Sequence, residues 1–395
     1  MSMKTNGTDK STPKINVEKA VRERYESGAQ AAEAALCCPV EYDTKYFEVI
    51  PQEIIERDYG CGDPSRYVQP GETVLDLGSG TGKICYIISQ MVGPEGKVIG
   101  VDMNEEMLAL ARKYQQEVGD RIGYHNVEFR RGKIENLHLD LDKANIYLKK
   151  NPIQSASDLM AYEEFEQDQR NRHPLIPDGS VDLVVSNCVL NLVKDEDKKQ
   201  LFEEIYRVLK KGGRVAISDI VSDEDVPEHL KNDPELWSGC ISGALREDEF
   251  LQAFADIGFY GIRIEKRDET PWQTVEGIEF RSLTITAYKG KEGPCLERNQ
   301  AVIYKGPWKA VIDDDGHTLY RSERMAVCDK TFSIYKSAPY ADEVIAIEPV
   351  EEMPLKEAVQ FACNKNARRH PRESKGLEYN VTELADGPAC GPDCC

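Results

Sequence analysis

The sequence predicts a doubly wound α/β sheet, mostly parallel and seven-stranded, followed by a small α+β domain. Two observations predict the sheet. Short apolar runs alternate with amphipathic segments from Thr73 onward, and the run SVDLVVSN is nearly continuous in apolar residues, as a strand buried on both faces requires. A third observation separates the second domain, because hairpin-like alternation and the turn DDDG replace that rhythm after about Gly293.

The expected elements alternate between strand and helix along most of the chain. The expected strands are, in chain order, 73–78, 97–103, 126–132, 180–187, 214–220, 259–267 and 281–289. The expected helices are 17–35, 83–92, 105–118, 197–213 and 247–259. Apolar residues recur every three to four positions in 105–118, which predicts a helix with one buried face, and the two glycines that end 197–213 predict a helix stop.

Changes in composition divide the chain into four segments. Residues 139–174, which are highly charged and weakly periodic, are expected to form a surface insertion between the third and fourth strands. The four segments are a polar arm and helix carrying Cys37 and Cys38 (1–45), the sheet domain (46–292), the α+β domain (293–380) and a flexible tail rich in glycine, proline and cysteine (381–395).

Charge and composition exclude several classes of function. The 395 residues carry a formal net charge of −20, which would repel a phosphate backbone, so nucleic acid is not an expected partner. No apolar run reaches the roughly 18 residues of a membrane span, and the polar N-terminus lacks the apolar segment of a signal peptide. We therefore expect a cytoplasmic protein, in which the 12 cysteines are thiols rather than a disulfide scaffold.

A glycine-rich loop after the first strand predicts a cofactor site. Gly78, Gly80 and Gly82 allow the backbone to turn sharply and to approach a ligand closely. Asp76 lies on the strand before the loop, and Asp102 ends the next strand, where a carboxylate can bind both hydroxyl groups of a ribose. A dinucleotide site is the alternative, but its third glycine falls one position later and no redox motif follows here.

The loop, the two aspartates and the order of strands and helices resemble the class I S-adenosylmethionine methyltransferases over about residues 55–290. Such a resemblance implies a Rossmann-like methyltransferase sheet. It also implies that Asp76 and the loop 78–82, with Ser79, hold the methionine end of the cofactor, and that Asp102 holds the ribose. The residues implied to lie against the adenine are Met103, Ile134 and Glu135.

Three cysteines are predicted to converge on the ligand-binding edge of the sheet. Cys188 follows the fourth strand, where the methyl acceptor must lie, and Cys61 and Cys240 lie in glycine-flanked loops at the same edge. Three thiolates suit As(III), a soft ion whose lone pair then remains at the fourth vertex as a nucleophile. A structural zinc site is the alternative, because Cys37 or Cys38 could supply the fourth thiolate that zinc prefers.

A closer resemblance rests on four motifs, DYGCG, LDLGSGTG, VVSNCVLNLV and WSGCISGAL. Together they resemble the arsenite methyltransferases over most of residues 20–290. The resemblance implies that Cys61, Cys188 and Cys240 are the three core thiols and that an upstream cysteine joins a disulfide relay. Cys37 and Cys38 both occupy that upstream place, and the choice between them stays open.

The same resemblance implies a reaction and its partners. As(III) or its glutathione conjugate passes to the three thiols and accepts methyl groups from S-adenosylmethionine. A pair of protein thiols, including Cys37 or Cys38, then returns arsenic to the trivalent state, and thioredoxin or glutathione resets the pair. Tyr59 and Asn187, which neighbour two of the core thiols, are candidate cofactor contacts. We expect a monomer.

Two other functions fit the same fold. A methyltransferase for an organic acceptor would need a general base, and the sequence offers none beside Cys188. A protein that only binds metalloids would keep the thiols and consume no cofactor. Cys85, among isoleucines, is expected to lie in the core. The scattered cysteines of the C-terminal domain, Cys295, Cys328 and Cys363, are given no chemistry.

Overall fold

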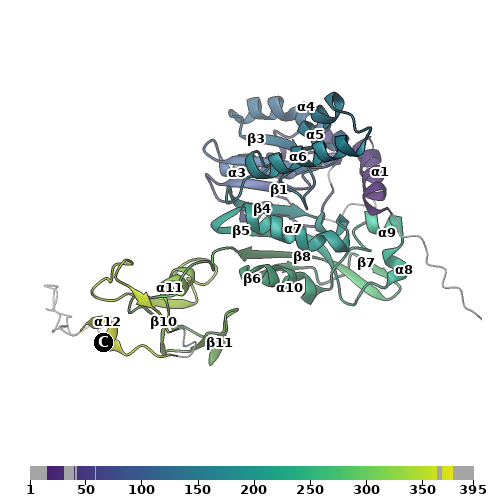
Figure 1. Cartoon of the computed structure of the whole chain (residues 1–395). Helices are drawn as coiled ribbons and strands as arrows, with labels where there is room; N and C mark the ends of the chain where they lie inside the picture. The colour runs from purple at the N-terminus through teal and green to yellow at the C-terminus, as the bar shows by residue number, and fades with distance from the viewer. Residues whose placement is uncertain (1–15, 31–39, 41, 58, 363–366, 377–395) are drawn as a thin grey trace, which may run out of the picture. The chain divides into compact units, whose positions relative to one another are not determined.

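The structure is a computed structural model that describes residues 16–30, 40, 42–57, 59–362 and 367–376. The chain divides into two compact units between Gly290 and Lys291. The first unit contains the sheet, and the second contains several short antiparallel strands (Figure 1).

An eight-stranded sheet forms the centre of the first unit. Its strands are β1 (Thr73–Leu77), β2 (Lys97–Asp102), β3 (Val127–Arg131), β4 (Val181–Asn187), β5 (Leu209–Ser222), β6 (Tyr260–Arg267), β7 (Gln273–Val275) and β8 (Ile278–Tyr288). The order is β3-β2-β1-β4-β5-β8-β6, and β7 pairs with β8. The five strands from β3 to β5 pair in parallel, whereas β8 is antiparallel to β5 and β6. The expected mostly parallel sheet of seven strands is confirmed, with β7 as a short addition.

Helices cover both faces of this sheet. They are α1 (Val17–Gln30), α2 (Gln52–Glu56), α3 (Lys83–Val92), α4 (Glu105–Ile122), α5 (Leu141–Lys150), α6 (Ala156–Arg172), α7 (Asp195–Val208), α8 (Glu228–Lys231), α9 (Pro234–Ser238) and α10 (Glu247–Ile257). Because successive strand residues point to opposite faces, Val74 packs in a core with α3 and α4, while Leu75 packs in a core with α7 and α10.

The segment 139–174, expected as an insertion between the third and fourth strands, contains the helices α5 and α6. Asp140 caps α5 and Ser155 caps α6, each through a side-chain oxygen that accepts backbone N–H groups. Tyr147 of α5 stacks on Phe165 of α6 with ring centroids 4.4 Å apart. These two helices make few apolar contacts beyond each other, since most of their residues are exposed or half-buried, and this explains the weak sequence periodicity.

Two boundaries also differ from the expectation. The helix predicted to run to the glycines of 197–213 ends at Val208, because Leu209 is already extended and pairs with Val181 of β4. Strand β7 was absent from the expected set; a two-residue turn at Glu276 and Gly277, both with positive φ, folds it onto β8. For the first expected helix, residues 31–35 lie outside the described part of the chain.

The second unit is a small α+β structure. Its strands are β9 (Leu296–Glu297), β10 (Ala301–Tyr304), β11 (Ala310–Ile312), β12 (Thr318–Tyr320), β13 (Arg324–Ala326), β14 (Val344–Ile347) and β15 (Val359–Gln360), and its helices are α11 (Asp329–Tyr335) and α12 (Pro371–Lys375). Strands β13-β10-β14 form an antiparallel sheet, and β11-β12 and β15-β9 form pairs. Val302 of β10 packs with Phe332 and Tyr335 of α11 in a separate core.

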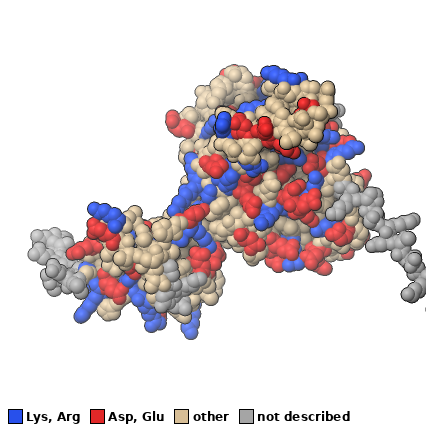
Figure 2. Space-filling view, in the orientation of Figure 1, with Lys and Arg blue, Asp and Glu red and all other residues tan. Residues whose placement is uncertain are grey.

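The surface carries both signs of charge despite the net charge of −20. Figure 2 shows acidic and basic side chains interspersed on the face that it draws, and many of them form ion pairs such as Lys97 with Glu128. Among the described residues, no helix has both the length and the apolar character required to cross a lipid bilayer.

Candidate functional site

The glycine loop turns the chain from β1 into α3 at the carboxyl edge of the sheet. Gly78 donates its N–H to the carbonyl oxygen of Val101 on β2, at 2.8 Å. Gly82 precedes α3 with φ of 87°, a left-handed conformation, and a Cβ atom there would lie 2.6 Å from the ring of Phe129. The loop can therefore hold this path only with glycine at Gly82.

A pocket lies over this loop and reaches Cys188. Eight of the residues expected to contact the cofactor line it, namely Tyr59, Gly78, Gly80, Asp102, Met103, Ile134, Glu135 and Asn187. Thr81 of the expected loop 78–82 also lines it. Further lining residues that the sequence did not reveal are Glu18, Val21, Arg22 and Tyr25 of α1, together with Arg57, Asn104, Met107, Gly132, Val189, Leu192, Val193, Lys194 and Asp197.

Helix α1 supplies one wall of this pocket and lies beside α9 and α4 (Figure 1). Val17 and Val21 pack against Trp237 of α9. Glu18 pairs with Lys194 at 2.8 Å and with Lys133 at 3.0 Å, and the hydrogen bond from Lys194 lowers the pKa of Glu18. Since α1 precedes the sheet by more than 40 residues, sequence spacing gave no signal of this contact.

Asp102 and its neighbours fit the ribose of S-adenosylmethionine. The Oδ2 atom of Asp102 accepts the N–H of Gly80 at 2.9 Å, and its Oδ1 atom accepts the N–H of Asn104 at 2.8 Å. Burial raises the pKa of Asp102, and the two backbone donors oppose that rise. A carboxylate held in this way at the end of β2 retains acceptor capacity for hydroxyl groups in the pocket.

A buried polar atom near the loop supports binding of a polar ligand there. Within the described residues, the Ser79 hydroxyl and the Asn104 Nδ2 group are buried without a hydrogen-bond partner. Burial also raises the pKa of Glu135, which lines the same pocket. Buried polar groups are normally satisfied, so the unsatisfied Nδ2 group of Asn104, which lines the pocket, indicates a ligand contact there, whereas Ser79 does not line the pocket.

Three expected cofactor residues do not line the pocket. Asp76 is 2% exposed, and its Oδ2 atom accepts the thiol of Cys85 at 3.2 Å. Ser79 and Gly82 lie in the loop below the pocket surface. Cys85 lies in the core as expected, with no exposed surface.

The structure brings the three expected core cysteines together at the carboxyl edge of the sheet. Cys61, Cys188 and Cys240 share one cluster, and the thiol of Cys240 donates to the carbonyl oxygen of Cys188 at 3.3 Å. Cys188 and Cys240 both adopt positive φ values, 62° and 63°. Residues other than glycine rarely adopt this conformation, and such strain is concentrated at functional sites.

Cys61 and Cys188 are joined in a disulfide, which differs from the three free thiols expected from the sequence. Their Cα atoms are 5.8 Å apart across a sequence separation of 127 residues. The two loops therefore approach closely enough for their sulfur atoms to bond, whereas Cys240 keeps its thiol. Cys37 and Cys38, the candidate relay cysteines, lie outside the described residues.

Asn187 fixes the loop that carries Cys61 against the end of β4. Its Oδ1 atom accepts the N–H groups of Cys61 and Gly62, at 2.9 and 3.0 Å, and its Nδ2 group donates to the carbonyl oxygen of Gly62 at 2.8 Å. A Cβ atom on Gly60 would lie 2.3 Å from Asn187. Asn187 thus positions a thiol-bearing loop and also lines the cofactor pocket.

Tyr25 and Asp219 are ionisable groups close to the thiols. Burial raises the pKa of Tyr25, whose hydroxyl interacts with the thiol of Cys240 and whose ring meets that of Tyr59 edge to face at 6.1 Å. Asp219 is fully buried at the end of β5, and burial raises its pKa to about 7, although it accepts the N–H of Leu190 at 2.9 Å.

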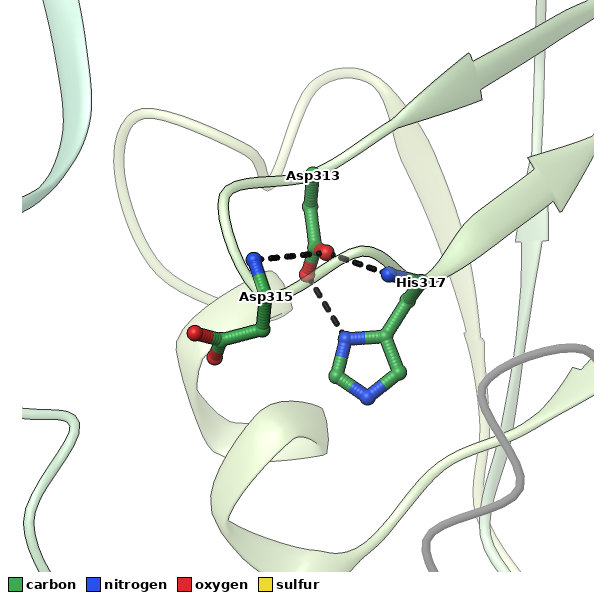
Figure 3. Close-up of side chains that lie close together, drawn as sticks. All are labelled: Asp313, Asp315 and His317. Atoms are coloured by element: carbon green, nitrogen blue, oxygen red, sulfur yellow. Dashed lines mark hydrogen bonds and ion pairs between the residues drawn. The ribbon is translucent and has the colours of Figure 1, made fainter.

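A separate cluster of potential metal ligands lies in the second unit, where Asp313, Asp315 and His317 are close together (Figure 3). Asp313 accepts the backbone N–H groups of Asp315 and His317, at 3.1 and 2.7 Å, and contacts the His317 ring at 2.9 Å. Tyr335 also donates to Asp313, and Lys291 pairs with Asp315. These contacts close the turn between β11 and β12.

The sheet order, the glycine loop and the carboxylate at the end of β2 define an S-adenosylmethionine-dependent methyltransferase of class I. A family model described as a methyltransferase domain matches residues 69–164 and 153–267. A second model, described as a domain of unknown function, matches residues 291–379.

Similarity to known proteins identifies the family within this class of methyltransferases. An arsenite methyltransferase of Aquipseudomonas alcaligenes is 32% identical and aligns over 73% of this chain and 77% of its own length. The arsenite methyltransferase of Homo sapiens is 31% identical over 87% of this chain and 86% of its own length. An arsenic(III) S-adenosylmethionine methyltransferase structure from Chlamydomonas reinhardtii is 28% identical, with a TM-score of 0.53, and covers 82% of this chain and 100% of that one. The chain belongs to the arsenite methyltransferase family.

Proposed function

We propose that this enzyme transfers methyl groups from S-adenosylmethionine to thiol-bound As(III) and so detoxifies arsenite. The observation that carries the proposal is that Cys188 lines the cofactor pocket while contacting both Cys61 and Cys240. A soft metalloid held at these sulfur atoms would therefore lie beside the cofactor. Family membership supports the same substrate.

The chain's own residues bind and orient the cofactor. Asp102 would accept the ribose hydroxyls, Glu135 and Met103 would border the adenine, and the loop 78–82 with Asp76 would support the methionine end. S-adenosylmethionine supplies an electrophilic methyl group when bound. Helix α1 and the segment 189–194 form walls of the pocket in which that group must meet its acceptor, and such walls would help to orient the two reactants.

The thiols bind the substrate by ligand exchange. Three reduced protein thiols displace three glutathione thiols from As(III), so no electrons move and the metalloid becomes a trigonal pyramid on Cys61, Cys188 and Cys240. The arsenic lone pair then points away from the three sulfur atoms. Cys188 lines the pocket, whereas Cys61 and Cys240 are buried and do not line it, so we expect the lone pair to face the cofactor.

A thiol reductant is part of this proposal. The Cys61–Cys188 disulfide must be opened before both sulfur atoms can bind arsenic, and two reductant thiols supply the two electrons and two protons. After methylation, formally pentavalent arsenic is reduced by a pair of protein thiols that includes Cys37 or Cys38, and this pair becomes a disulfide. Thioredoxin or glutathione resets it. We also propose that the enzyme acts as a monomer in the cytoplasm, where a reducing environment keeps its cysteines as thiols.

The test is a turnover assay on the reduced full-length chain with arsenite and S-adenosylmethionine. We expect S-adenosylhomocysteine and methylated arsenicals to appear together. Cys188→Ser should reduce both products to background while leaving S-adenosylhomocysteine binding within a few-fold, because Cys188 is only one of many pocket residues. Cys295→Ser is the matched control, since it makes the same change at a half-buried cysteine of the other unit.

Other outcomes identify the competing functions. Full arsenite turnover by Cys188→Ser would contradict the mechanism above. Arsenite binding without formation of S-adenosylhomocysteine would indicate a protein that only buffers metalloids. Methylation of a quinone or lipid that survives replacement of Cys61, Cys188 and Cys240 would indicate an organic acceptor.

A further inference from the structure

Two cysteines that are distant in sequence meet in the second unit. Cys295 precedes β9 and Cys328 precedes α11, and both are free thiols. They share a small apolar cluster with Ala326 and Phe361. Cys295 packs against the buried residues of this cluster, Cys328 among them, and after burial its thiol adds to the raised pKa of Cys328.

Backbone hydrogen bonds on both sides fix this pair. Strand β9 pairs with β15, and Phe361 donates its N–H to the carbonyl oxygen of Cys295 at 2.8 Å. Phe332 of α11 donates to the carbonyl oxygen of Cys328, also at 2.8 Å. Since both backbones are anchored, a ligand that bridges the two sulfur atoms requires only side-chain adjustment, and little ordering entropy is lost on binding.

The two thiols differ in accessibility. Cys328 is 3% exposed, and its sulfur accepts the N–H of Thr331 at 3.4 Å, whereas Cys295 is half-buried and can be reached from solvent. Burial is also the largest cause that raises the pKa of Cys328, so at neutral pH it remains a thiol, which oxidises more slowly than a thiolate. Cys295 can thus bind an incoming ligand first, and Cys328 can complete the bridge within the same unit.

We propose that Cys295 and Cys328 form a second, non-catalytic As(III) site on this enzyme. Arsenite, As(OH)₃, exchanges two of its hydroxyl groups for the two thiols and releases two water molecules, so no oxidant or reductant takes part. The third hydroxyl group stays on arsenic and remains exchangeable. The identity of the ligand rests on the proposed function, because As(III) is the substrate of that reaction, but the site itself lies in a different unit from Cys61, Cys188 and Cys240.

The test uses the full-length chain, kept reduced with a phosphine, and phenylarsonous acid, which bridges two thiols. We expect peptide mass spectrometry to recover the peptides of Cys295 and Cys328 joined through one phenylarsenic group. Other cysteines of the chain can also bind the probe, so the readout is the difference in stoichiometry between the parent and each variant. Cys295→Ser and Cys328→Ser should each lose one equivalent, and the double variant should lose no more than one.

The comparison of single and double variants separates a shared site from two independent ones. Unchanged stoichiometry in Cys295→Ser would overturn the proposal, as would recovery of a Cys295–Cys328 disulfide without any arsenic-linked peptide. If Cys328→Ser fails to fold because its contacts with Thr331 change, the half-buried Cys295→Ser still decides the question.

Methylation measured in parallel distinguishes this inference from the proposed function. Both serine variants should retain arsenite methylation within about twofold, since neither side chain belongs to the catalytic thiols. Bridging of Cys295 and Cys328 in a chain that does not methylate arsenite would refute the proposed function alone. Methylation without that bridge would refute this inference alone.

Discussion

Asn187 makes three hydrogen bonds to the backbone of Cys61 and Gly62, in the loop that carries one of the proposed catalytic thiols. At about 1 kcal/mol each, their loss in Asn187→Ala should raise amide exchange in residues 59–63 by at least about tenfold. Hydrogen-exchange mass spectrometry measures this directly. Asn171→Ala, on the exposed face of α6, is the matched control and should leave the loop unchanged. Equal exchange in the two variants would contradict a positioning role for Asn187.

The raised pKa of Asp219 predicts that the stability of the folded chain depends on pH. Its pKa is raised to about 7 in the folded chain by burial, so between the ordinary aspartate pKa of about 4 and about 7 the unfolded chain has lost a proton that the folded chain keeps. The free energy of unfolding therefore falls by about 1.4 kcal/mol per pH unit as the pH rises through this window, and no further above it.

Thermal unfolding of Asp219→Asn at pH 5 to 8 tests this linkage. The amide cannot ionise, so the variant should lose the destabilisation that the parent shows on going from pH 5 to pH 7. Asp256→Asn, at an exposed position of α10, removes a carboxylate without removing a buried one and should follow the parent. A parallel pH profile for the parent and Asp219→Asn would show that the carboxyl is ionised throughout.

The cysteines show how far residues can be placed from sequence. Cys188 lies at the carboxyl edge because it directly follows the parallel strand β4, and this rule is readable from the strand pattern. Cys61 precedes β1, and the hydrogen bond from its N–H to Asn187 that holds it beside Cys188 is not readable from that pattern. Cys295 and Cys328 lie in one cluster. Cys295 precedes β9, which pairs with β15, and strands of two residues are too short to show a periodic pattern of apolar residues. The proximity of Cys295 and Cys328 could therefore be found only from the structure.

At the scale of elements, α1 links the cofactor pocket to the loop of Cys240. Val17 of α1 packs on Trp237 of α9, close to that loop, and does not line the pocket itself. Val17→Asp would bury a carboxylate against the indole ring, so α1 should detach and the pocket should lose one wall. We predict at least a tenfold loss of S-adenosylhomocysteine affinity, measured by calorimetric titration.

Lys19→Asp is the control for this prediction, because it introduces the same side chain on the exposed face of α1. Its effect on affinity should stay within about twofold, since surface ion pairs such as Lys19–Glu23 contribute little. If both variants bind S-adenosylhomocysteine as the parent does, α1 does not hold the cofactor.

Elements with a continuous apolar face were predictable, and those defined by tertiary contacts were not. Helix α3 spans the expected 83–92, because its apolar residues fill a core. The predicted end of α7 was wrong by several residues, because the pairing of Leu209 with Val181 outweighs the helical preference of the lysines that follow. No elements were predicted within the segment 139–174, because α5 and α6 have few buried residues and stack Tyr147 on Phe165.

At the scale of the whole molecule, the chain combines two units with separate cores, the large sheet unit and the small unit of residues 291–395. The cofactor pocket and the proposed catalytic thiols belong entirely to the first unit. The proposed second As(III) site belongs entirely to the other unit. A ligand that binds one unit should therefore stabilise that unit and leave the other unchanged.

Differential scanning calorimetry of the full-length chain tests this independence. S-adenosylhomocysteine at about 100 times its dissociation constant should add about 2.7 kcal/mol to the unit that binds it, which shifts that transition upward by several degrees. The transition of smaller enthalpy, expected for the unit of residues 291–395, should stay in place because that unit has its own core of Val302, Phe332 and Tyr335. If one cooperative transition shifts as a whole, the two units unfold together and their stabilities are coupled.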